Sequence, residues 1–145
     1  MGIRDLMRGR RVYFDAMIFI YLIEGYSELQ DRLFEIRDSL LKTEAKVFTS
    51  ELTICETLVV PFRNNDVAMV SKYREFIEDS GAFEVLPAHR ATWIRASLYR
   101  AQFGLKTPDA VHVASAVEAG CELFVTNDKL IKSPKGIKVA SLRTV

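Results

Sequence analysis

Hydrophobic and polar positions along the chain follow two spacings, one typical of strands and one typical of helices. Short runs rich in Val, Phe and Ile predict strands over residues 11–14, 46–49, 83–87, 122–126 and 137–142. Longer stretches with apolar residues three and four positions apart predict helices over residues 16–24, 28–42, 51–60, 66–79, 89–103 and 108–119. This alternation is typical of βα units, so we expect an α/β fold with a mainly parallel sheet of about five strands.

Capping and turn residues mark the predicted helix ends. Ser50 and Thr107 are good N-cap residues, and Pro108 suits the first helical position after Thr107. Pro61 is expected to close the helix over residues 51–60. The chain has 145 residues and no linker rich in Pro, Gly or Ser, and one domain takes roughly 100–200 residues. We therefore expect a single domain over residues 1–145.

The predicted helix over residues 16–24 is apolar almost all round, which places it in a core or at a subunit interface. Trp93 and Tyr99 add aromatic surface beyond what one small core needs, and we predict a symmetric homodimer. The longest apolar stretch, 16–23, is far shorter than the roughly 20 residues that span a bilayer. No apolar secretory segment precedes the first strand, so we expect a cytoplasmic protein without a membrane partner.

Composition and charge narrow the function classes. Apolar residues make up 49% of the chain and charged residues 27%, which excludes a disordered protein and a disulfide scaffold. The formal net charge of +1 gives no general sign of nucleic-acid binding, so a nuclease would need a local basic patch. Cys55 and Cys121 lie in apolar runs and are expected to be buried free thiols, which suits a reducing compartment.

Four acidic residues occupy positions that a parallel sheet would bring together. Asp15 ends the first predicted strand, and Asp128 comes two residues after the strand 122–126. Asp109 lies in the first turn of its helix. Glu56 has the apolar neighbours Leu52, Val59 and Val60 at helical spacing, so we expect it to point inward. Because ligands bind beyond the carboxyl ends of parallel strands, all four are candidate site residues.

Carboxylates gathered in one cleft repel one another unless a cation lies between them. Oxygen ligands alone suit Mg²⁺ or Mn²⁺, and the implied chemistry is metal-assisted hydrolysis of a phosphodiester. Each acid also has a simpler interpretation that stays open. Asp15 can cap the helix after it, Asp109 can favour its helix dipole, and Asp128 can be a turn residue.

The segments "VYFDAMIFIYLIEG", "TSELTICETLVVP" and "LKTPDAVHVASAVEAGCELFVTND", in this order, resemble the PIN domain. Within it they are similar to the VapC-type toxins of toxin–antitoxin pairs, over about residues 11 to 142. The resemblance implies a three-layer α/β/α sandwich and a ribonuclease that depends on Mg²⁺ or Mn²⁺. It also implies a homodimer, an RNA substrate and an antitoxin partner.

The acidic quartet of the family corresponds to Asp15, Glu56, Asp109 and Asp128, as catalytic and metal-binding residues. Its polar residues at the last strand end correspond to Thr126 and Asn127. Met17 stands where the family often has a small polar residue. Two alternatives stay open, a PIN-like nuclease outside a toxin–antitoxin pair and a non-catalytic domain that binds RNA or a partner protein.

Further polar residues could orient these acids or contact a substrate. His112 is one helical turn after Asp109 and could orient it or contact phosphate, although a structural role is also open. Lys106 precedes Asp109 by three residues and could reach a phosphate. Two basic clusters could bind an RNA backbone or could be solvated surface, and they are Arg8, Arg10 and Arg11, and Lys129, Lys132 and Lys135.

Overall fold

The computed structural model describes residues 1–128 and 131–145. The strands are β1 (Arg11–Phe14), β2 (Lys46–Ser50), β3 (Phe83–Leu86), β4 (Leu123–Thr126) and β5 (Lys138–Ser141). The helices are α1 (Ile3–Met7), α2 (Ala16–Glu24), α3 (Gln30–Leu41), α4 (Glu51–Arg63), α5 (Val67–Arg74), α6 (Arg90–Phe103) and α7 (Thr107–Glu118). Two short turns, η1 (Ser27–Leu29) and η2 (Glu75–Asp79), extend this set.

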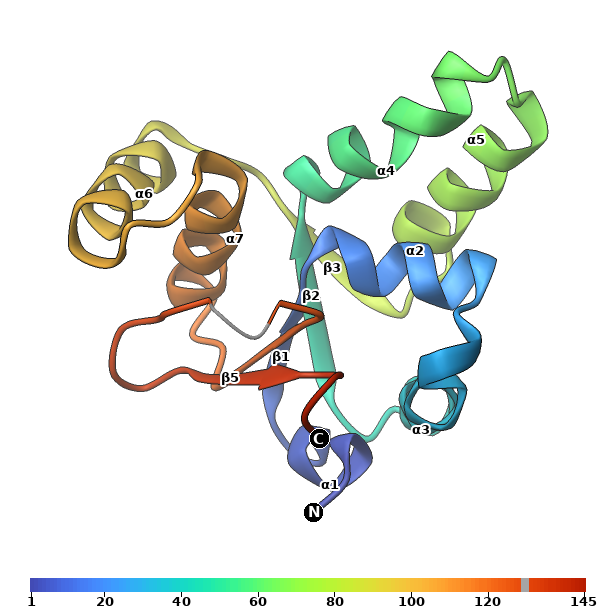
Figure 1. Ribbon diagram of the computed structural model, residues 1–145, viewed down its shortest axis with the longest axis horizontal. Helices are drawn as coiled ribbons and strands as arrows, with labels where there is room; N and C mark the ends of the chain where they lie inside the picture. The colour runs from blue at the N-terminus through green and yellow to red at the C-terminus, as the bar shows by residue number, and fades with distance from the viewer. Residues whose placement is uncertain (129–130) are drawn as a thin grey trace.

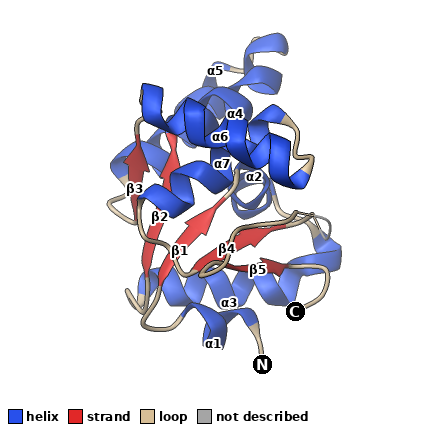
Figure 2. Ribbon diagram, turned by 90° about the vertical axis from the view of Figure 1, so that its left-hand side faces the viewer, coloured by secondary structure: helices blue, strands red, loops and turns tan. Residues whose placement is uncertain are grey.

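The five strands form one sheet in the order β3-β2-β1-β4-β5, and every neighbouring pair is parallel. Figure 2 shows the strands side by side in this order. The predicted α/β fold with a five-strand parallel sheet is confirmed. Because β1 lies between β2 and β4, the residues that follow β1 and β4 meet at one edge of the sheet.

Helices cover both faces of the sheet, giving three layers (Figure 1). Side chains along a strand alternate between faces, and β1 shows the consequence. Val12 and Phe14 join the core formed with α1, α2, α3 and η2, whereas Tyr13 joins the core formed with α6 and α7. Both cores are closed by buried apolar side chains, so the sheet is a rigid platform for whatever its carboxyl edge carries.

Helix α1 is not among the helices expected from the sequence. Its signal is present, since Ile3, Leu6 and Met7 have helical spacing and are all buried. The prediction that Pro61 closes its helix is wrong. The buried Pro61 ring lies within α4, which continues to Arg63, and in the last turn it removes a single intrahelical hydrogen bond.

The two predicted helix caps have different outcomes. Ser50 holds the N-cap position of α4, but the Ser50 Oγ lies 2.9 Å from the Tyr13 hydroxyl instead of capping the helix. At α7 the N-cap residue is Lys106, and Thr107 is already helical. The prediction of two buried thiols is half wrong, because Cys55 is exposed on α4 and Cys121 is buried.

Tyr99 also departs from its expected role, because it is buried in the core under α6 and offers no interface surface. Helix α2 likewise buries most of its side chains within its own chain, so its apolar character is explained without a second subunit. Trp93 remains about half exposed. Among the described helices, none is long and apolar enough to cross a membrane.

Candidate active site

The candidate site lies at the carboxyl edge of the sheet, where β1 and β4 end side by side. Phe14 pairs with Val125, so Asp15 and Thr126 are the next residues on the two strands. The Thr126 hydroxyl donates a 2.5 Å hydrogen bond to Asp15 Oδ2. Asp15 holds the N-cap position of α2, yet its carboxylate is bound by the neighbouring strand across 111 residues of sequence.

The second oxygen of Asp15, Oδ1, is buried and has no hydrogen-bond partner within residues 1–128 and 131–145. Burial raises the pKa of Asp15 to about 6, although His112 and the Thr126 hydrogen bond act in the opposite direction. A buried carboxylate with an unpaired oxygen is costly when it is ionised. This oxygen is therefore the strongest structural sign that the pocket accommodates a cation or a proton.

Asp109 lies in the first turn of α7 and is half-buried. Burial is the main cause that raises its pKa, and the carboxylates of Asp128 and Glu56 raise it further, whereas His112 and Lys106 lower it. Asp109 also raises the pKa of Asp15. Asp109 is therefore within electrostatic reach of the other three acids predicted from the sequence.

Asp128 is exposed, and its backbone N–H donates to the Thr126 Oγ1 at 3.1 Å. Thr126 thus contacts both Asp15 and the segment that carries Asp128. Lys106 is exposed at the N-cap of α7, close enough to lower the pKa of Asp109. One threonine at a strand end therefore links the buried and the exposed acid.

Glu56 does not point into an apolar stripe as expected, because Val59 and Val60 are themselves exposed. Its side chain is 32% exposed, and its Oε1 lies 2.6 Å from the His112 Nε2. His112 is buried, and its Nδ1 lies 2.7 Å from the Tyr13 hydroxyl. His112 therefore contacts Glu56 and Tyr13 directly, and its influence on Asp109 is electrostatic.

Asn127 lies on the α2 side of the site. Its Nδ2 donates to the Tyr21 hydroxyl at 2.8 Å, and its Oδ1 is buried without a partner among the described residues. The Tyr21 ring stacks on Tyr26, and the nearby Arg143 guanidinium partly offsets the effect of burial, which raises the pKa of Tyr21. The sequence gives little sign of this aromatic support, since Tyr21 lies in a helix that is apolar almost all round.

Sequence reasoning also missed Tyr13. The available signal was the position of Tyr13 two residues before Asp15 on the same strand. Because side chains along a strand alternate between faces, Tyr13 lies on the face of the sheet opposite α2. Contact between Tyr13 and His112 joins positions 99 residues apart, so no local pattern could show it.

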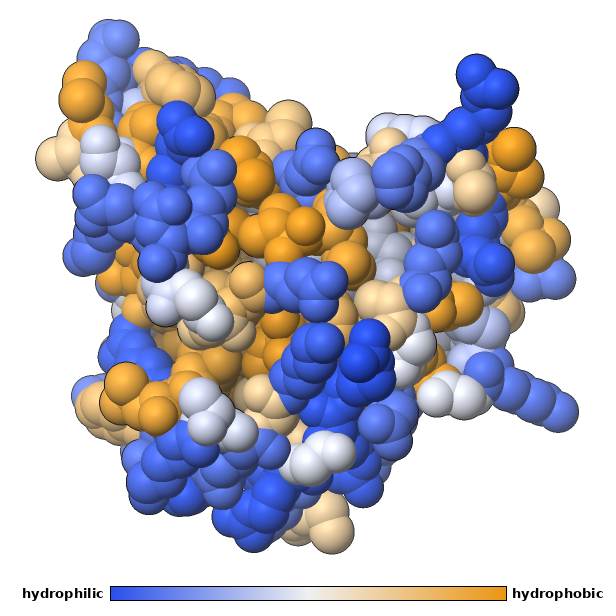
Figure 3. Space-filling view, turned by 180° about the vertical axis from the view of Figure 1, so that it is seen from behind, coloured by the Kyte–Doolittle hydropathy of each residue, from blue (hydrophilic) through white to orange (hydrophobic). Residues whose placement is uncertain are grey.

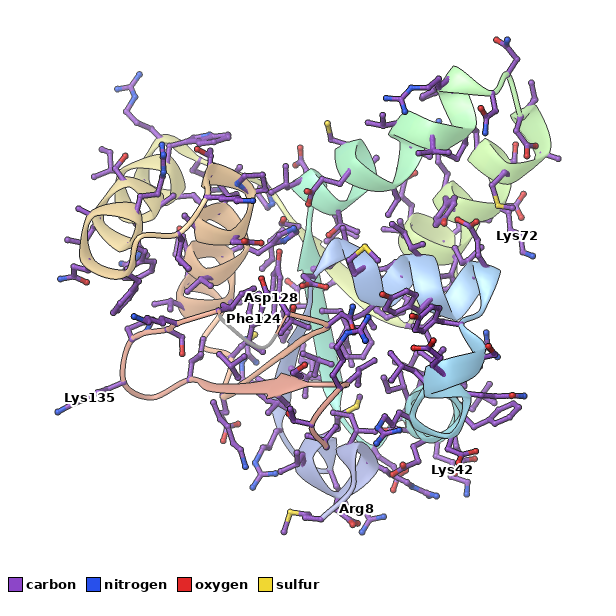
Figure 4. The ribbon with its side chains drawn as sticks, viewed as in Figure 1. Arg8, Lys42, Lys72, Phe124, Asp128 and Lys135 are labelled. Atoms are coloured by element: carbon purple, nitrogen blue, oxygen red, sulfur yellow. The ribbon has the colours of Figure 1, made fainter. Side chains whose placement is uncertain are left out.

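The first basic cluster lies far from the candidate acids. Arg8, Arg10 and Arg11 lie at the start of β1, at the end of the sheet opposite Asp15. Figure 4 shows Arg8 beside α1 and Asp128 well above it. These side chains have local partners there, with Arg8 bound to Glu44 and Arg11 bound to the Ala119 carbonyl.

In the second predicted basic cluster, Lys132 and Lys135 are exposed on the segment after β4, and Lys129 lies outside the described residues. Lys135 points outward, away from Asp128 (Figure 4). Lys135 therefore does not approach the acids.

The carboxylates at this edge of the sheet offer oxygen atoms that could bind a metal ion. Within the described parts of the chain, no three His, Cys, Asp or Glu side chains already stand together as a metal site. The donor set still suits a hard cation, because Asp15 offers an unpaired buried oxygen and Asp109 is destabilised as an anion. These residues fit a divalent ion that would draw the carboxylates together.

Comparison with known proteins identifies the fold family. The PIN domain family model matches residues 12–136, which is most of the chain. The chain belongs to the PIN domain family. No curated protein matches its sequence.

Solved structures resemble this PIN domain at low sequence identity. A toxin–antitoxin complex from Klebsiella pneumoniae matches with a TM-score of 0.65 and 21% identity, over 88% of this chain and 95% of the other. VapBC2 from Rickettsia felis, bound to a promoter DNA fragment, matches with a TM-score of 0.69 and 12% identity, over 90% of this chain and 98% of the other. DNA-bound VapBC from Salmonella typhimurium matches with a TM-score of 0.65 and 17% identity, over 92% of this chain and 98% of the other. At these identities the likeness establishes the shared fold.

Proposed function

We propose that this PIN domain is a metal-dependent endoribonuclease and the toxin of a toxin–antitoxin pair. The observation that carries the proposal is the buried, unpaired Oδ1 of Asp15 at a sheet edge shared with Asp109 and Asp128. A purely structural aspartate would have both oxygens satisfied, as buried polar atoms usually are. The PIN domain assignment supports a nuclease over other metal-dependent functions.

Asp15, Asp109 and Asp128 would hold a Mg²⁺ or Mn²⁺ ion, and Glu56 would complete the acidic cluster. When bound, such an ion lowers the pKa of a water molecule and neutralises phosphate charge. The chain's own residues have separate tasks. Thr126 fixes the orientation of the Asp15 carboxylate through its 2.5 Å hydrogen bond. The exposed Lys106, near Asp109, is placed to attract a phosphate of the RNA.

Incubation of purified protein with a total RNA pool in Mg²⁺, Mn²⁺ or EDTA tests this function. We expect cleavage with either metal and none in EDTA. Calorimetric titration of Mn²⁺ should give measurable affinity for the wild type and much weaker affinity for Asp15→Ala. Phe34→Ala, a change at an exposed position on α3, serves as a matched surface control. Equal Mn²⁺ affinity in wild type and Asp15→Ala, or RNA cleavage in EDTA, would overturn the proposal.

We also infer a homodimer and an antitoxin partner, in the cytoplasm. The surface is hollowed between the lobe of α4 and α5 and the lobe of α6 and α7, with hydrophobic residues along it (Figure 3). Exposed apolar side chains lie on both flanking helices, α4 and α6, and are Val59, Val60, Phe62, Trp93, Ile94 and Leu98. A surface of this kind favours association with another protein chain. The structural neighbours, which are described as toxin–antitoxin complexes, support the antitoxin.

A further inference from the structure

We propose that His112 is a positioning residue that holds the Glu56 carboxylate in the acidic cluster. The inference rests on the proposed nuclease function, since it assigns Glu56 a task in that reaction. It differs from the role expected from the sequence, in which His112 acts on Asp109. The geometry behind it is a chain of contacts that joins β1, α7 and α4.

The His112 ring is fixed at both of its nitrogens. Nε2 lies 2.6 Å from the Glu56 Oε1, and Nδ1 lies 2.7 Å from the Tyr13 hydroxyl. Only 2% of His112 is exposed, so the ring has no room to turn. Because an ionised carboxylate can only accept hydrogen bonds, Nε2 is the donor to Glu56 whether the ring is neutral or charged.

Tyr13 anchors the other end of this chain. Its ring stacks on Phe124 at 5.3 Å and meets the His112 ring edge-on at 5.6 Å. Its hydroxyl also lies 2.9 Å from the Ser50 Oγ, at the end of β2. The ring of His112 is therefore held through Tyr13, which is itself fixed by groups on β2 and β4, and His112 in turn fixes Glu56 on α4.

Glu56 needs such an anchor because its side chain is one-third exposed and has three rotatable bonds. It reaches the cluster from a different helix than Asp109, and its charge raises the pKa of Asp109. Repulsion between these carboxylates would favour rotamers of Glu56 that point to solvent. The hydrogen bond from His112 opposes that motion, as partners of a metal-binding carboxylate commonly do.

The test compares three variants of the full chain on one RNA substrate. His112→Leu removes both hydrogen bonds, His112→Gln keeps an N–H donor near the position of Nε2, and Val113→Ala is the control. Val113 is fully buried on the same helix, so its truncation lowers the stability of α7 packing without contact to Glu56.

We expect His112→Leu to lower kcat by about 10–100-fold, with KM for RNA changed by less than about threefold. His112→Gln should recover most of kcat, and Val113→Ala should keep the wild-type kcat while unfolding at lower urea concentration. In a Glu56→Gln background, His112→Leu should have almost no further effect, since its action passes through Glu56. Equal loss in His112→Leu and His112→Gln, or an undiminished effect of His112→Leu in the Glu56→Gln background, would overturn the inference.

Mn²⁺ calorimetry separates failure of this inference from failure of the proposed function. If the wild type binds Mn²⁺ but cleaves no RNA, the ribonuclease proposal fails. The positioning of Glu56 by His112 is then judged by the affinity of the variants for Mn²⁺. His112→Leu should weaken Mn²⁺ binding by about tenfold or more, with recovery in His112→Gln. Unchanged Mn²⁺ affinity in His112→Leu, or no Mn²⁺ binding by the wild type, would refute the positioning role in that case.

Discussion

In the metal-free protein, the free energy of unfolding of Asp15→Asn should increase relative to that of wild type as pH rises. Asn has nearly the shape of a protonated aspartate and can still accept the Thr126 hydrogen bond. The wild-type carboxyl has a pKa of about 6 in the folded protein against an ordinary value of 3.8. Its contribution to stability is therefore fully present below about pH 4 and is lost as pH rises through about 6.

The size of the effect follows from that shift. A shift of about 2 units at about 1.4 kcal/mol per unit corresponds to about 3 kcal/mol. Asp15 is 7% exposed, so solvent does little to reduce this figure. Any fixed cost of the Asn amide is the same at every pH and cancels when the difference between variant and wild type is followed with pH.

The assay is urea unfolding of both proteins in EDTA at several pH values from 4 to 8. We expect the free energy of unfolding of Asp15→Asn, minus that of wild type, to rise by about 3 kcal/mol across this range. Mn²⁺ added at pH 8 should cancel most of this difference by stabilising only the wild type, by about 2.7 kcal/mol at one hundred times the dissociation constant. A difference that stays flat with pH, or falls, would refute the account of a buried, unpaired carboxylate.

Three further outcomes are expected. Asp109→Asn should abolish RNA cleavage, yet in EDTA at pH 7 it should unfold at a urea concentration equal to or higher than that of wild type, because burial raises the pKa of Asp109. If Asp109 only favoured its helix dipole, the substitution would lower the free energy of unfolding by about 0.3–1 kcal/mol and leave RNA cleavage intact. Arg8→Ala should leave KM for RNA unchanged, while Lys106→Ala raises it by about threefold to tenfold and reduces its salt dependence. In sedimentation at micromolar concentration, Trp93→Asp should be a monomer, whereas Phe34→Asp, a change at another exposed apolar residue, should remain a dimer. A monomeric wild type would contradict the homodimer.

The sheet could be predicted from the sequence because its strands are short, largely apolar runs next to turns, a pattern that burial on both faces demands of β1, β2 and β4. Helix α1 was missed because its three apolar residues stand among arginines that dominate the segment. Asp15 and Asp109 could be found because their positions at element ends follow from topology alone.

Contacts between distant side chains could not be predicted in the same way. Glu56 was expected to face an apolar environment, but its orientation is set by His112, which comes 56 positions later. Ser50 and Thr107 are good caps by composition, yet the Tyr13 hydroxyl lies against Ser50, and α7 begins one residue earlier than expected. The arginines near Asp15 in sequence lie across the length of a strand from it in space.

The position of β1 in the sheet also determines when the site can form during synthesis. Its neighbour β4 comes more than 100 residues later, so a nascent chain has one unpaired edge on β1 until residues 123–126 have emerged. Asp15 is made 111 positions before its hydroxyl partner Thr126. A nascent chain that stops before β4 therefore carries the acids Asp15, Glu56 and Asp109 without the strand that organises them, and this edge of the sheet assembles only after β4 has been made.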